Sequence, residues 1–141
     1  MQIIIFTNSN GNVSVCVPTG ELPIEEVLAK DCPKDAIIVD DSILPKGDDA
    51  AFFDAWVLNG QTVSVDLTKA QSFATANINL VAKAEAQHRI TNASIGLTNV
   101  LSDADWIALL TSARTAISAA KTTSDLIAAI KPVSDAIEAN K

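Results

Sequence analysis

The sequence has few of the residues that most often carry chemistry. Its 141 residues include one histidine, two cysteines and no tyrosine. Cys16 and Cys32 have neither C-x-x-C spacing nor a nearby histidine, so we interpret them as two free thiols. The sequence lacks the glycine-rich loops that bind phosphate and the motifs of zinc proteases and serine hydrolases. We therefore predict that the protein is not an enzyme and holds no metal or cofactor.

Positive charge and long apolar runs are also scarce. Ten lysines and arginines oppose seventeen acidic residues, which leaves a formal net charge of -7. Nucleic acid would repel such a chain. No stretch approaches the roughly 18 apolar residues of a membrane-spanning helix, and the first residues lack the pattern of a signal peptide. These features predict a cytoplasmic, soluble protein that binds neither nucleic acid nor a membrane.

The first half of the sequence has the patterns of β-strands. Residues 2–6 and 13–17 are β-branched runs separated by Asn10 and Gly11, which favour a tight reversal. The unbroken apolar run Ile3 to Phe6 predicts a central strand that is covered on both faces. A short helix should follow Pro23 and cover the sheet.

Three further patterns complete this half. Residues 36–39 predict another strand, and residues 56–58 and 62–65 predict a hairpin around the Asn59-Gly60 pair. Phe52 and Phe53 lie just before this hairpin and are candidates to pack on the sheet. Residues 1–66 should thus form a small β-rich unit with an antiparallel or mixed sheet and one covering helix.

After Asp66 the apolar period changes from two to about 3.6, which predicts that residues 67–141 are α-helical. A first helix should run from about residue 67 to about residue 90. Ser102 is a good cap for a second helix, and Thr123 or Ser124 for a third, with Pro132 kinking that helix or starting a final turn. The predicted fold class is therefore α+β, with a β-rich unit at 1–66 and a helical region at 67–141.

The charged residues give weak signals for a site. His88 lies beside Glu85 and Arg89 on what the pattern indicates is a polar, solvated helix face. Five acids gather between residues 40 and 54, namely Asp40, Asp41, Asp48, Asp49 and Asp54. Their spacing departs from that of a calcium-binding EF-hand, which favours a solvated acidic loop. Cation binding by this loop stays open at this point.

The helix over 67–90 is the best candidate for a contact with a partner. Its apolar stripe is thin and contains Phe73, Ala76, Leu80 and Ala84, followed by Ile90. Such a helix buries too little apolar area alone to offset the entropy lost on ordering. We therefore expect these four residues to contact another helix, either within the chain or in a partner, and we expect a homo-oligomer or docking on a larger assembly.

Three strings in the first half carry a resemblance. IIIFTNSNGNVSVCVPTG, the segment FFDAW at residues 52–56 and NGQTVSVDLTKA resemble small proteins encoded among the tail genes of bacteriophages and prophages. The resemblance implies a non-enzymatic structural or tail fibre assembly protein whose partners are other phage structural proteins or itself. It also implies a location in the host cytoplasm during assembly or in the virion. The alternative is a small ligand-binding protein or an enzyme of unrecognised type.

Overall fold

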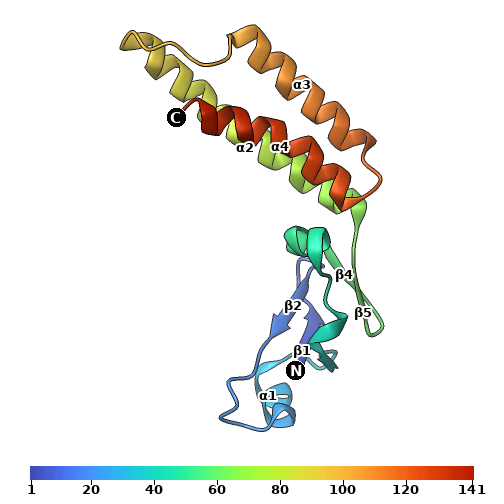
Figure 1. The fold of residues 1–141 in the computed structure, drawn as a ribbon. Helices are drawn as coiled ribbons and strands as arrows, with labels where there is room; N and C mark the ends of the chain where they lie inside the picture. Colours follow the sequence, from blue (N-terminus) through green and yellow to red (C-terminus); the bar gives the residue numbers. More distant parts are fainter. The chain divides into compact units, whose positions relative to one another are not determined.

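The computed structural model describes residues 1–141, which form two compact units, Met1–Asp66 and Leu67–Lys141. The first unit contains all the strands and one α-helix, and the second contains three longer helices (Figure 1). The predicted α+β fold class is confirmed. Each unit is described separately below.

The first unit is built on a three-stranded antiparallel sheet with the order β2-β1-β3. Its strands are β1 (Gln2–Thr7), β2 (Val13–Cys16) and β3 (Ile37–Asp40). The central position predicted for the first strand from its unbroken apolar run is confirmed, because β1 pairs with a neighbour on each side.

Both faces of β1 are covered. Ile3 and Ile5 point to one face, where they pack with Val13 and with Trp56 and Val63 of a second, two-stranded sheet. Ile4 points to the opposite face, which the helix α1 (Ile24–Asp31) covers through contacts with β1 and β3. All three isoleucines are almost fully buried, so the run Ile3 to Ile5 forms the centre of this unit.

The second sheet is the predicted hairpin, formed by β4 (Trp56–Asn59) and β5 (Thr62–Val65). Asn59 pairs with Thr62, so the turn residues are Gly60 and Gln61 and not the expected Asn59-Gly60 pair. Gly60 has a positive φ of 62° and Gln61 does not, as in a type II′ turn with glycine first. The reversal between β1 and β2 also differs from the expected tight turn at Asn10 and Gly11, because it is a longer loop. The Asn8 side chain holds this loop by accepting hydrogen bonds from the backbone N–H groups of Asn10 and Asn12.

Two 3-10 segments lead into the hairpin, η1 (Asp41–Ile43) and η2 (Gly47–Ala55). The Trp56 indole N–H donates to the Asp49 carbonyl at 3.0 Å, and its ring lies 4.8 Å from that of Phe53. Trp56 is buried and Phe52 is half-buried, whereas Phe53 is exposed. The FFDAW segment therefore fixes the start of β4 through its tryptophan.

The second unit contains α2 (Leu67–Ser94), α3 (Asp103–Ala119) and α4 (Thr123–Ala139), each in contact with the other two. Gln71 near the start of α2 donates to carbonyls at the end of α3, and Asn140 after α4 reaches the second half of α2. The helices α2 and α4 therefore run in the same direction and α3 runs opposite to them (Figure 1). The apolar core contains Ala70, Ala74, Ile78, Trp106, Leu110, Ala113, Ile117, Leu126, Ala129 and Val133.

The helix ends follow ordinary capping chemistry. Ser102 caps α3 as predicted, because its hydroxyl accepts from the Asp105 N–H. The cap of α4 was wrongly placed: Thr122, and not Thr123 or Ser124, accepts from the Asp125 N–H, and Asp125 completes a capping box. The Asp125 carboxylate accepts a hydrogen bond from the backbone N–H of Lys121, and both the side chain and the backbone N–H of Thr122 also bond to it. These hydrogen bonds hold the pKa of Asp125 below its usual value. The helix then continues through Pro132.

Candidate functional site

The four residues predicted to contact a partner all lie on an exposed face of α2. Phe73 is 44% exposed and Leu80 is 68% exposed, and Ala76 and Ala84 are exposed as well. The stripe predicted from the apolar pattern is therefore not the face of α2 that packs against the other helices of this unit. The two small residues lie at the edges of grooves, Ala76 beside Ile117 of α3 and Ala84 beside Ile137 of α4, whereas Phe73 and Leu80 expose the most apolar surface.

The packed face of α2 has a different composition along its length. In its first half it consists of small or aliphatic side chains, Ala70, Ala74 and Ile78. In its second half it carries polar side chains, Glu85, Arg89 and Asn92, which are each less than a tenth exposed. The inner face of the helix thus changes from apolar to polar after Ile78.

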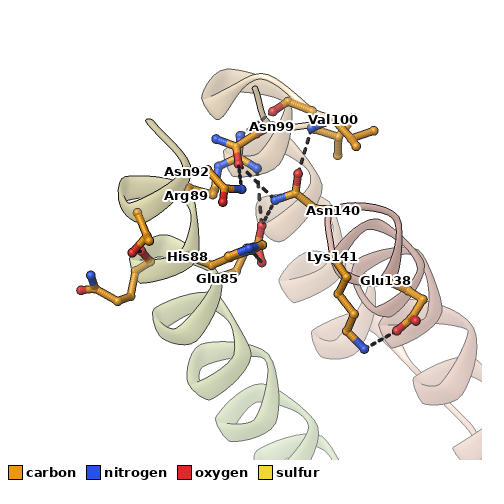
Figure 2. A network of polar contacts seen from close by, with 12 residues as sticks. Glu85, His88, Arg89, Asn92, Asn99, Val100, Glu138, Asn140 and Lys141 are labelled. Atoms are coloured by element: carbon orange, nitrogen blue, oxygen red, sulfur yellow. Dashed lines mark hydrogen bonds and ion pairs between the residues drawn. The ribbon is translucent and has the colours of Figure 1, made fainter. Parts of the chain in front are cut away.

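These polar side chains belong to a hydrogen-bonded network at the end of the unit where α2 and α4 finish (Figure 2). The Asn140 side-chain amide donates to Glu85 Oε1 at 2.6 Å and to Asn99 Oδ1 at 3.2 Å, and its oxygen accepts from the Val100 N–H at 2.9 Å. Asn92 also donates to Asn99 at 2.9 Å. Asn140 therefore ties α4 to α2 and to the connection between α2 and α3.

Arg89 is the one cation in the interior of this network. Its guanidinium lies 3.7 Å from Glu85, donates to Asp103 at 2.9 Å and donates to the Leu101 carbonyl. It also lies over the Trp106 ring, 5.9 Å from the centroid, within the range of a cation–π contact. The prediction that Glu85 and Arg89 lie on a solvated helix face was wrong, because both residues are buried. Beside their mutual contact, Glu85 binds Asn140 and Arg89 binds Asp103, and neither of these partners lies on α2.

His88 is half-exposed at the edge of the network. Its Nδ1 lies 3.4 Å from Glu85 Oε2. The sequence placed Glu85 beside His88 but did not predict this contact. It borders a groove of about 340 Å³ between α2 and α4, lined by Val81, Ala84, Glu85, His88, Ile137 and Lys141. The groove is thus lined by the Glu85–His88 pair and by mainly aliphatic side chains.

Several large apolar side chains are exposed where α2 turns into α3. Ile90, Ile95, Leu97, Val100 and Ile107 are each more than half exposed. Together with Phe73 and Leu80 they make up all the exposed large hydrophobic residues of the second unit. Neither the helix caps nor the apolar periodicity of the sequence predicted that exposed apolar residues would gather at this end of the second unit.

The acidic segment 40–54 contributes to local structure. Asp40 caps η1 by accepting from the Ser42 N–H at 3.0 Å, and hydrogen bonds from Ser42 and from the amino group of Met1 lower the pKa of Asp40 to about 2. No group of three or more His, Cys, Asp or Glu side chains in the chain is arranged to hold a metal ion. The five acids therefore do not converge on one point.

The two cysteines are free thiols, as predicted, but they are not isolated from each other. Cys16 ends β2 and Cys32 follows the last residue of α1, and both are half-buried. Burial raises the pKa of the Cys32 thiol, and the neighbouring Cys16 raises that pKa further. The fold thus places Cys16 close enough to Cys32 to act on its pKa, although the two residues are 16 positions apart in the sequence.

None of the helices is both long enough and apolar enough to cross a lipid bilayer. Comparison of the chain with protein families, with curated proteins and with solved structures finds no match in any of the three.

Proposed function

We propose that this chain is a non-enzymatic structural or assembly protein of a bacteriophage tail, and that it acts by pairing with a second copy through the exposed stripe of α2. The tail context rests on the resemblance of the first 70 residues to tail-region proteins. The contact surface rests on one observation, the exposure of Phe73 and Leu80 on a helix whose opposite side packs in its own unit.

The stripe alternates large and small side chains, in the order Phe73, Ala76, Leu80 and Ala84. In a two-fold antiparallel pairing of two α2 helices, Phe73 of one copy falls opposite Ala84 of the other, and Ala76 falls opposite Leu80. Each large side chain then packs over a small one, which allows the helices to approach closely. A closed two-fold pair of this kind uses the same surface on both copies.

Charge does not oppose this pairing. Glu85 is the only acidic residue of α2 and it points into the network of its own unit. In the antiparallel register Lys83 precedes the residue that falls opposite Phe73 of the second copy, so the two copies of Lys83 do not face each other. The other 16 of the 17 acidic residues lie outside α2.

Replacing Leu80 by aspartate should convert the pair into monomers without unfolding them. The position is exposed in one copy, so the charge stays solvated in the monomer, whereas in the pair it would be buried against the alanine of the partner. Light scattering at a series of concentrations measures the change. Ile107→Asp is the matched control, because Ile107 is 61% exposed on α3 and lies outside the stripe, and it should leave pairing intact.

Cysteine cross-linking fixes the orientation of the same pair. In a Cys16→Ser, Cys32→Ser background, an equal mixture of Phe73→Cys and Ala84→Cys chains should give mainly the mixed dimer on oxidation. A parallel pair would give mainly 73–73 and 84–84 dimers. A wild-type chain that stays monomeric at every concentration in light scattering, with cysteine variants that form no dimer on oxidation, overturns the self-pairing.

The tail context has its own experiment. Particles of the phage that encodes the chain should contain it in a fixed ratio to a tail protein when analysed by mass spectrometry, or should lack functional tails when its gene is deleted. Complete, infectious particles that neither contain nor need the chain would contradict the proposal. A monomeric chain that is nevertheless present in tails would point to another tail protein as the occupant of the stripe.

The alternative of a ligand-binding protein or an enzyme has one feature in its favour. The groove beside His88 places an imidazole, a buried carboxylate and an aliphatic wall together. The exposed stripe on α2 gives the contact protein the stronger support, because a stripe of this kind needs a macromolecular partner to be covered.

A further inference from the structure

Cys16 lies on the face of the three-stranded sheet that α1 covers, and Cys32 directly follows α1. The strand register sets Cys16 of β2 opposite Ile4 of β1, which in turn is opposite Ile38 of β3. Residues opposite each other in a sheet point to the same face. That face is the one α1 packs against, and Cys32 directly follows the end of α1.

A second observation agrees with this placement. The pKa of the Cys32 thiol is raised by its burial, by the adjacent Cys16 thiol and by the charge of Asp31. The Cys16 thiol is thus close enough to Cys32 to act on its pKa, and both side chains are only half-buried. Small reagents dissolved in water can reach this pair.

We propose that Cys16 and Cys32 are a modification site, at which a small-molecule disulfide such as oxidised glutathione converts the two thiols into one intramolecular disulfide. In the first step, one thiolate attacks a sulfur of the glutathione disulfide, forms a mixed disulfide and releases one glutathione thiolate. In the second step, the other cysteine thiolate attacks the protein-bound sulfur and releases the second glutathione. The two thiols lose two protons and two electrons, and the glutathione disulfide is reduced to two thiols.

The bond would anchor α1, the one α-helix of the first unit. No residue of α1 is fully buried, and Ile24, Val27 and Leu28 are half-buried on the sheet. A bond between its end and β2 closes the segment from 16 to 32 into a loop, which removes freedom from the unfolded chain. We expect the oxidised chain to unfold at a higher temperature and to protect the amides of α1 better from hydrogen exchange.

The raised pKa of Cys32 also bears on the pH dependence of the reaction. At neutral pH less of this thiol is ionised than of an ordinary cysteine, and only the thiolate reacts. The rate of bond formation should therefore rise as the pH is raised through the alkaline range.

The test incubates the full chain in buffers of graded reduced and oxidised glutathione. Intact mass should fall by two hydrogens with no glutathione attached, peptide mapping should join 16 to 32, and the unfolding midpoint should shift upward. Cys16→Ser and Cys32→Ser chains should each acquire one glutathione and show no upward shift. Stable glutathione adducts on both cysteines of the wild type, or a bond that forms only in urea or between two chains, would overturn the proposal. Oxidation should leave the α2 pairing unchanged, so this result and the proposed function fail independently.

Discussion

Arg89→Ala should destabilise the helical unit by about 3–5 kcal/mol, the loss typical of breaking a buried ion pair from one side. The substitution removes the only cation beside the buried carboxylate of Glu85 within the network, the hydrogen bonds to Asp103 and Leu101, and the contact with Trp106. Hydrogen exchange of the amides of α2, α3 and α4 in the full chain measures the free energy of opening of this unit alone.

Two further variants separate the causes of that loss. Asp103→Ala removes a partner that is mostly solvent-exposed and should cost at most about 1 kcal/mol. Glu85→Gln in the Arg89→Ala background keeps an oxygen for the Asn140 amide but removes the buried charge. The double variant should therefore be more stable than Arg89→Ala. If it is no more stable, the loss comes from the packing on Trp106 and the bond to Leu101, and the charge is not its cause.

Ile4→Ala should destabilise the β-rich unit by about 2–5 kcal/mol, the range for truncating a fully buried isoleucine to alanine. Ile4 lies at the centre of β1 and fills the space between the sheet and α1. Hydrogen exchange of β1 and its neighbours gives the change in opening free energy. Val17→Ala removes an exposed side chain just beyond β2 and should change stability by no more than about 0.5 kcal/mol. Equal effects of the two substitutions would contradict the placement of Ile4.

The β-rich unit could be predicted closely because its signals are local. An unbroken run such as Ile3 to Phe6 needs apolar neighbours on both faces, and only a central strand supplies them. The hairpin around Gly60 was predicted as well, but the observed turn residues, 60 and 61, lie one position later than the predicted pair. Asn-Gly pairs favour the turn centre, whereas here Asn59 completes the strand pair and glycine takes the first turn position.

The helical unit was harder to predict in detail because α2 has two stripes. Large side chains at Phe73 and Leu80 dominate any apolar count, yet alanines at 70 and 74 form the packed face, since small residues let the helices come close. The polar interior was missed for a different reason. Glu85 is satisfied by Asn140, which lies 55 residues further along the chain, and sequence patterns report only near neighbours.

The short strands of the first unit limit how copies of this chain can add to one another edge to edge. β2, β3, β4 and β5 are each four residues long, and β1, the only longer strand, is paired on both sides. Short edge strands offer few free backbone groups to an incoming strand, and this is one way in which natural sheets avoid edge-to-edge growth. A chain held at high local concentration in an assembly would thereby be protected from amyloid-like stacking, and any ordered contact between copies would fall to the helices.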